Sequence, residues 1–83
     1  MKIEFSGDSF KRHSVTPQQV FEALAVVVDE HSQEDSKRGN PREIQIGFTQ
    51  SGVLLEIGIE YLDVDHFNIY HVDDCREYYK DRL

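Results

Sequence analysis

The side chains that could carry out acid–base chemistry are few and are spread along the chain. The four histidines are His13, His31, His66 and His71. No two of them have the spacing of a metal-binding pair, and the last two are five residues apart, which points them to opposite faces of a strand. The paired carboxylates Asp63/Asp65 and Asp73/Asp74 occupy a turn and a helix start, where Asp is favoured for backbone reasons. No Gly-rich phosphate loop, nucleophile elbow or metalloprotease motif occurs.

A cluster of three cationic or near-cationic side chains, Lys11-Arg12-His13, stands out because the chain is acidic. Sixteen acidic and nine basic residues give a net charge of −7. This charge disfavours strong unspecific binding to nucleic acid, whose affinity comes largely from Lys and Arg contacts with phosphate. It suits solubility or a basic partner protein. The cluster is therefore either a local basic site or a solvated turn with Phe10 tucked into the core.

Length and composition favour one small domain. Eighty-three residues are near the size at which a single core just supports folding. The single cysteine, Cys75, excludes an internal disulfide and disfavours a cysteine-built zinc site. No apolar run approaches the ~20 residues of a membrane helix, and the N-terminus lacks the pattern of a secretory signal. We expect a cytoplasmic protein without a cofactor and without membrane contact.

The stretch from Glu43 to Val72 predicts a three-stranded antiparallel meander. Its three runs, EIQIGFTQ, VLLEIGIEYL and HFNIYHV, alternate apolar and polar residues, which is typical of a sheet with one buried face. A two-residue turn at Ser51-Gly52 would place Ile46 opposite Ile57 and keep Glu56 and Glu60 away from the isoleucines. A second turn of three residues, or five with looser ends, would place Tyr61 opposite Phe67 and Ile57 opposite His71.

One main helix is expected to cover the apolar face. Thr16-Pro17-Gln18-Gln19 has the residues of a capping box with Pro at the first helical position, and the helical spacing of apolar residues extends to about Asp29 or Glu30. His31 to Arg42 contains no apolar residue and predicts a loop. Asp73 or Asp74 could cap a short C-terminal helix from Cys75 to about Arg82. The predicted class is α+β, and Met1–Phe5 could add a fourth short edge strand.

The second face of the predicted sheet would carry Gly47 and Gly58, which leave a shallow trough. Tyr70 would lie across from Gly58 and could fill it, as aromatic rings often do beside a strand glycine. The trough could be a ligand groove, or the C-terminal helix could lay Tyr78 or Tyr79 over it.

Two segments together resemble the BrnT-like toxins, a family within the RelE-like toxin group. The first is Arg12 to Val20. It resembles the family's basic residue, His, Gly-Val and Ser/Thr before an acidic helix start. The second is Ile46 to Leu55, which resembles an "LGxTxxGRxLLVV" hairpin. The resemblance covers most of the chain from Arg12 onward. The chain differs from the family at the presumed active site: Ser14 replaces Gly, Val53 replaces Arg, and His71-Val72 stands where the family has Ala-Arg.

The resemblance implies a compact α+β toxin fold, metal-free endoribonuclease activity, weak or lost in this chain, and neutralisation by a cognate antitoxin. Metal-free RNA cleavage requires a base, an acid and a cation for the phosphate. His13 and His71 are the expected acid and base, and Arg12 or Arg76 is expected on the phosphate. The alternative is a non-catalytic interaction module of the same fold, which acts through its acidic surface.

Overall fold

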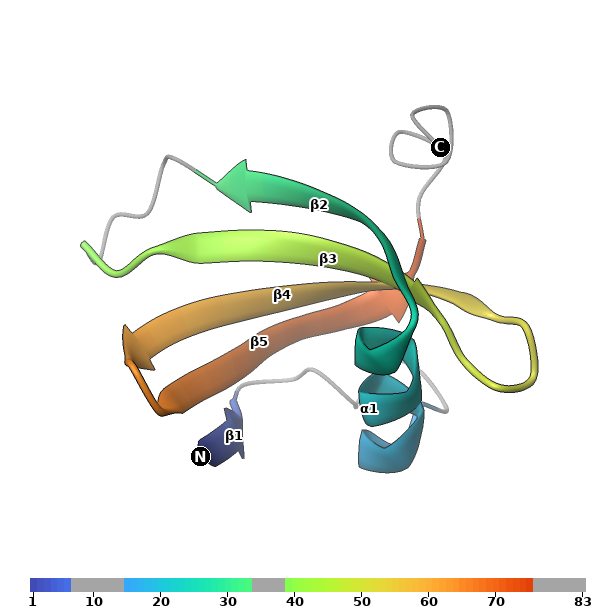
Figure 1. Cartoon of the computed structure of the whole chain (residues 1–83), viewed down its shortest axis with the longest axis horizontal. Coiled ribbons are helices and arrows are strands. Elements are labelled where there is room, and N and C mark those ends of the chain that lie inside the picture. The colour runs from blue at the N-terminus through green and yellow to red at the C-terminus, as the bar shows by residue number, and fades with distance from the viewer. Residues whose placement is uncertain (7–14, 34–38, 76–83) are drawn as a thin grey trace.

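The structure, a computed structural model, describes residues 1–6, 15–33 and 39–75, and it contains five strands and one helix there. The elements are β1 (Lys2–Phe5), α1 (Pro17–Ala25), β2 (Val27–Gln33), β3 (Arg42–Phe48), β4 (Leu54–Asp63) and β5 (His66–Asp74). The strands form one sheet in the order β1-β5-β4-β3-β2, with α1 packed on one face (Figure 1). β1 pairs with β5 in parallel, and the other neighbours are antiparallel. The predicted three-stranded antiparallel meander under one main helix is therefore wrong: the sheet has five strands and is mixed.

Helix α1 begins as predicted and ends much earlier. The Thr16 hydroxyl accepts a hydrogen bond from the Gln19 backbone N–H at 3.3 Å, and Gln19 Oε1 accepts one from the Thr16 N–H at 2.9 Å. The helix stops at Ala25, and the chain continues from Val27 as strand β2. Three consecutive β-branched residues, Val26 to Val28, lose side-chain freedom in a helix and fit a pleated strand. The predicted extension to Asp29 or Glu30 is wrong for this reason.

The first part of the predicted loop after the helix is also a strand. His31 pairs with Ile44, and Gln33 pairs with Arg42, so β2 continues three residues into a segment without apolar side chains. This segment is a strand because its backbone pairs with β3, and not because its side chains alternate between apolar and polar. Residues 34–38 lie outside the described part of the chain.

The β3–β4 hairpin has a register one residue away from the predicted one. Thr49 and Val53 close a loop of three residues, with the Thr49 N–H donating to the Val53 carbonyl at 2.9 Å. Gly52 has φ +88, the left-handed conformation that a three-residue hairpin loop requires and that Gly adopts without steric cost. As a result Ile46 lies opposite Glu56 and Ile44 lies opposite Gly58. The predicted two-residue turn at Ser51-Gly52 is wrong.

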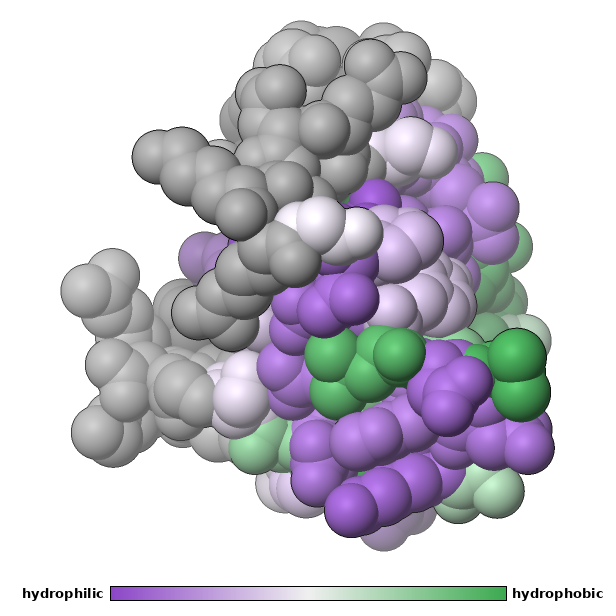
Figure 2. All heavy atoms as spheres, turned by 90° about the vertical axis from the view of Figure 1, so that its left-hand side faces the viewer, coloured by the Kyte–Doolittle hydropathy of each residue, from purple (hydrophilic) through white to green (hydrophobic). Residues whose placement is uncertain are grey.

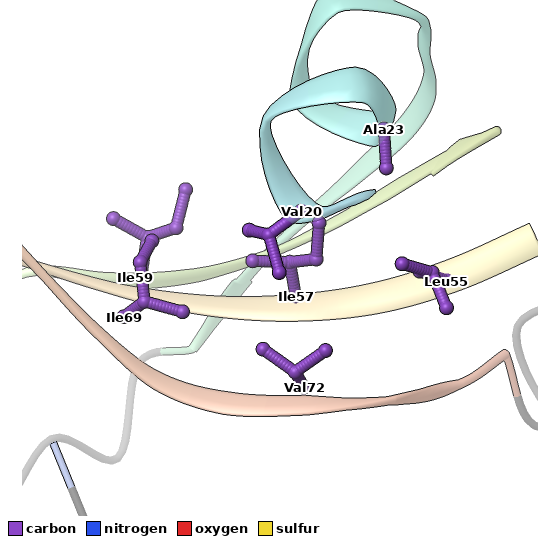
Figure 3. Packing of buried hydrophobic residues seen from close by; sticks show 7 residues of the cluster. All are labelled: Val20, Ala23, Leu55, Ile57, Ile59, Ile69 and Val72. Carbon is purple, nitrogen blue, oxygen red and sulfur yellow. The ribbon is translucent and has the colours of Figure 1, made fainter. Parts of the chain in front are cut away.

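This register gives the sheet two different buried faces. The helix-side face holds the main core, in which Val20 and Ala23 of α1 pack on the sheet (Figure 3). The strand residues of this core are Leu55, Ile57, Ile59, Ile69 and Val72. The opposite face carries a smaller cluster of Ile44, Ile46 and Cys75. The expectation that Ile44 and Ile46 share the helix-side face with Ile57 and Ile59 is therefore wrong.

The β4–β5 pairing agrees with the prediction at one end and departs from it at the other. Tyr61 lies opposite Phe67 and Ile59 opposite Ile69, as expected. A bulge between Gly58 and Ile59 then shifts the register, so Ile57 pairs with Val72 instead of His71. Bulges of this kind re-aim side chains and are common beside functional sites.

The sequence also predicted structure at the two ends of the chain. The short N-terminal edge strand is present as β1. Asp73 and Asp74, predicted to cap a C-terminal helix, are the last two residues of β5. Residues 76–83, which hold most of that predicted helix, lie outside the described part of the chain. Among the described residues, no helix is long and apolar enough to cross a membrane.

Candidate active site

The sheet face opposite α1 brings together a set of buried and half-buried polar side chains. They come from three adjacent strands: Arg42 on β3, Glu56 and Glu60 on β4, and Asn68, Tyr70 and His71 on β5. Glu56 is 0% exposed and Glu60 is 2% exposed. An isolated ionised carboxylate in an apolar interior is costly, so each buried Glu requires a partner that compensates its charge or its hydrogen-bonding capacity.

Glu56 is paired with His71. Glu56 Oε2 lies 2.9 Å from His71 Nε2, and the His71 side chain remains 36% exposed. A buried carboxylate fixes the orientation and the tautomer of the imidazole that it contacts. When Nε2–H of the neutral ring donates to Glu56, Nδ1 keeps a lone pair that can accept a proton. The pair therefore has the parts of a general acid–base group that solvent can reach.

The negative charge of Glu60 is compensated by residues other than a histidine. It lies 3.6 Å from Arg42 Nη2 and accepts hydrogen bonds from Asn68 Nδ2 at 3.3 Å and from Asn40 Nδ2 at 3.5 Å. The Arg42 guanidinium also stacks on the Tyr70 ring, 4.5 Å from its centroid. Because Arg42 is held by Glu60 and Tyr70, it serves this cluster as a structural cation rather than as a free phosphate ligand.

The bulge and Gly58 explain how β5 presents both Tyr70 and His71 on this face. A Cβ at Gly58 would lie 2.7 Å from Tyr70 Cζ and 2.9 Å from His71 Cβ. The Tyr70 ring thus occupies the space that Gly58 leaves, as the sequence suggested. The predicted trough does not form, because Gly47 faces the other way: a Cβ there would lie 2.0 Å from the Ala23 carbonyl oxygen of α1.

The structure places only one of the four predicted catalytic residues. His71 lies on β5, and it faces away from α1, whereas the predicted register put it on the helix-covered face. Arg12, His13 and Arg76 lie outside the described residues, so the structure neither brings them to His71 nor separates them from it. Glu56, the partner of His71, was missed because the predicted β4–β5 register paired His71 with Ile57 on the opposite face. The bulge between Gly58 and Ile59 places His71 opposite Gly58, on the face of Glu56.

The other two described histidines pair with carboxylates at the edges of the sheet. His31 Nε2 lies 2.9 Å from Asp29 Oδ2 on β2, and His66 Nε2 lies 2.9 Å from Glu4 Oε2 on β1. Within the described part of the chain, no three His, Cys, Asp or Glu side chains gather into a group that could hold a metal ion.

The helix-side face contains a separate pocket of about 350 Å³. α1 covers only part of this face, and the pocket lies where β1 and the ends of β4 and β5 extend beyond it. Its lining is mostly apolar and consists of Met1, Ile3, Phe21, Leu24, Ala25, Gln45, Ile59, Tyr61, Phe67 and Ile69. The Tyr61 and Phe67 rings meet edge to face at 5.3 Å on its floor.

The ionisation of Tyr61, which lines this pocket, makes the free energy of unfolding depend on pH in the alkaline range. Burial, followed by the nearby carboxylate of Glu43, raises the pKa of Tyr61 to about 12. In the unfolded chain the phenol titrates near its ordinary pKa of about 10. Between these values the unfolded state loses a proton that the folded state keeps, so the free energy of unfolding falls as pH rises from about 10 to about 12. Below about pH 10 this contribution is fully present.

The Tyr61→Phe variant is expected to lose this dependence. Urea unfolding of the wild type and the variant at several pH values from 8 to above 11 measures it, because the remaining tyrosines are common to both proteins. The free energy of unfolding should fall less steeply with pH in the variant. Equal slopes would mean that Tyr61 does not keep its proton in the folded state.

Comparisons with protein-family models, with curated proteins and with solved structures found no match to this chain.

Proposed function

We propose that this protein is a toxin-like endoribonuclease that cleaves RNA without a metal ion and uses His71, oriented by Glu56, as its acid–base group. The single observation that carries the proposal is the 2.9 Å contact between the buried Glu56 carboxylate and the half-exposed His71 ring. A buried carboxylate with no role in the core is costly, whereas behind a solvent-accessible imidazole it makes an acid–base pair.

The reaction that fits this pair is transfer of the RNA phosphate to the neighbouring 2′-hydroxyl. His71 takes the 2′-hydroxyl proton, the oxygen attacks phosphorus, and the bond to the 5′-oxygen breaks with a proton delivered to that leaving oxygen. His13 is the proposed donor of that proton, and Arg12 or Arg76 is the proposed cation on the phosphate. These two roles come from the sequence resemblance and remain predictions.

The net charge of −7 sets the conditions for a test, because it weakens RNA binding. Single-turnover conditions with protein in excess, low salt and EDTA remove the dependence on tight binding and on contaminating metal-dependent nucleases. The substrate is a labelled RNA oligonucleotide, and the matched control carries 2′-deoxy residues. We expect cleavage of the RNA to products with 2′,3′-cyclic phosphate ends and no cleavage of the control.

Two results would contradict the proposal. One is the absence of cleavage by protein whose folding has been verified. The other is cleavage that requires Mg²⁺ or that proceeds equally on the 2′-deoxy control. The first result would favour the alternative of a non-catalytic acidic module that acts by binding a partner.

A further inference from the structure

The proposed ribonuclease reaction does not use the pocket on the helix side of the sheet. It lies on the face opposite His71 and Glu56, and aliphatic and aromatic side chains make most of its wall. Two of these remain open to solvent: Phe21 is 44% exposed and Met1 is 85% exposed. Apolar surface that is concave and solvent-exposed typically marks a binding site.

The rim of this pocket toward β2 and β3 is acidic. Glu30 lies opposite Gln45 in the β2–β3 pairing, and Glu43 lies two residues before Gln45 on β3, so both are on the sheet face of the pocket that Gln45 lines. Glu43 accepts a hydrogen bond from Gln45 Nε2, and Gln45 itself lines the pocket. Within residues 1–6, 15–33 and 39–75, neither Glu30 nor Glu43 has a cationic ion-pair partner. Apolar walls and a negatively charged rim therefore lie side by side.

The volume of the pocket limits the size of the group that it can bind. About 350 Å³ is at the lower limit of the range of small-molecule sites and suits one bulky side chain with part of its neighbours. Seen from the end of the sheet where β3 begins and β4 ends, the described surface is mostly hydrophilic, with separate apolar patches (Figure 2). An occupant that brings one apolar anchor and positive charge matches this pattern better than a broad apolar interface does.

We propose that this pocket docks a basic segment of a partner protein, which inserts one aromatic or long aliphatic side chain between α1 and β1 and places Lys or Arg beside Glu30 and Glu43. The anchor contacts Phe21 and Leu24 on one side and the floor of Ile59, Tyr61 and Phe67 beneath. The flanking cations pair with these two carboxylates. The proposal does not depend on the ribonuclease activity, because the two sites lie on opposite faces of the sheet.

The test uses short synthetic peptides and the amide NMR spectrum of the full chain. The probe peptide has a central Phe flanked on each side by two Lys residues. Its controls replace Phe by Ala, or all Lys residues by Glu. The fourth probe is 2-phenylethylammonium, which carries the same ring and a single charge without a peptide. Each is titrated to saturation or to its solubility limit, and the dissociation constant and the shifted residues are recorded.

The proposal predicts saturable shifts at Ile3, Leu24, Ile59 and Tyr61 with the Phe-Lys peptide. Loss of the anchor in the Ala peptide should weaken binding by roughly 10-fold or more, as for an interface hot spot. The acidic peptide should not bind, and 2-phenylethylammonium should bind more weakly than the Phe-Lys peptide. Higher salt should weaken the Phe-Lys peptide's binding.

Variants of the protein locate the site independently. Ala25→Trp fills the pocket from the end of α1 and should abolish binding, while Ala25→Ser leaves the pocket open and should not. Glu43→Gln should weaken binding roughly two- to five-fold, the effect of one partly exposed ion pair. Glu22→Gln, on α1 outside the lining, is the matched charge control and should change it less.

Several outcomes would overturn the proposal. These are the absence of saturable shifts, shifts confined to the face of Glu56 and His71, and unchanged binding by Ala25→Trp. Binding of the acidic peptide with equal affinity would show that binding does not depend on charge complementarity. Binding of 2-phenylethylammonium as tightly as the peptide would make the pocket a small-molecule site instead of a protein-docking site.

Discussion

Replacing His71 by Ala is expected to slow RNA cleavage by roughly 10²- to 10⁴-fold, the usual contribution of a positioned acid–base group. The physical reason is that the variant removes the ring that pairs with the buried Glu56 carboxylate. Because the loss of this partner also affects stability, urea unfolding is measured beside the rate to show that the variant is folded. The side chain is 36% exposed, so its truncation leaves little cavity. The first-order rate constant under single-turnover conditions in EDTA measures the effect.

His66→Ala is the matched control for this experiment. His66 lies on the same strand and its Nε2 is also 2.9 Å from a carboxylate oxygen, that of Glu4, but this pair is at the β1 edge of the sheet. Its loss should leave the rate within about twofold of wild type, because it is not near Glu56. If His71→Ala cleaves RNA as fast as wild type, or if both variants lose activity equally, His71 is not the acid–base group.

Glu56→Gln separates orientation from folding. Glutamine keeps the shape of the side chain and can still meet the ring, but its amide no longer fixes which ring nitrogen carries the proton. We expect slower cleavage than by the wild type, from protein that urea unfolding shows to be folded. Equal cleavage rates for the variant and the wild type would mean that Glu56 does not orient His71 for proton transfer.

The second large effect is on stability: Gly47→Ala is expected to lower the free energy of unfolding by about 3 kcal/mol or more. A Cβ at this position would lie 2.0 Å from the Ala23 carbonyl oxygen and 2.8 Å from its carbon. These are backbone atoms near the end of α1, so the clash cannot be relieved by a side-chain rotation and the helix must move off the sheet. Overpacking of this kind exceeds the ordinary cost of one to three kcal/mol per inserted group. Urea unfolding measures it.

Gly58→Ala is the matched control because Gly58 is also a strand glycine. Its added Cβ would meet the Tyr70 ring at 2.7 Å, which is a side chain that can rotate, and His71 Cβ at 2.9 Å. We expect a smaller loss of stability than for Gly47→Ala. A Gly47→Ala protein as stable as wild type would mean that α1 does not pack on this strand at Gly47.

The sequence predicts the strands better than it predicts how they pair. Alternation of apolar and polar residues locates β3, β4 and β5, and it finds the pairs Tyr61–Phe67 and Ile59–Ile69. It does not distinguish a two-residue from a three-residue loop around Gly52. That single residue moved Ile44 and Ile46 to the other face and placed them beside Glu56 and Glu60. The rule that charged residues avoid a buried face failed because Arg42, Asn68 and His71 compensate those carboxylates.

The start of helix α1 depends on local sequence, and its end depends on contacts with the rest of the fold. The capping box from Thr16 to Gln19 is a local signal, and it marks the start of α1 correctly. The end of the helix depends on whether the valines that follow meet a neighbouring strand, and β3 is that neighbour. Periodicity alone could not reveal this, because Val27 and Val28 fit a helical stripe as well as a strand.

The candidate site could be predicted only in part. His71 was identified from the sequence, whereas its partner Glu56 emerged only with the observed register. Arg12, His13 and Arg76 remain predictions. The pocket beside α1 could not be predicted either, because it exists only where a short helix leaves the far end of a five-stranded sheet uncovered.

The measurement that tests this account most directly is the pattern of cross-strand nuclear Overhauser effects between β4 and β5. The Glu56–His71 pair depends on the register that places His71 opposite Gly58 and Val72 opposite Ile57. The structure predicts backbone contacts for these two pairs in a labelled sample. A contact of His71 with Ile57 in place of Gly58 would contradict it, and would return Glu56 and His71 to opposite faces of the sheet.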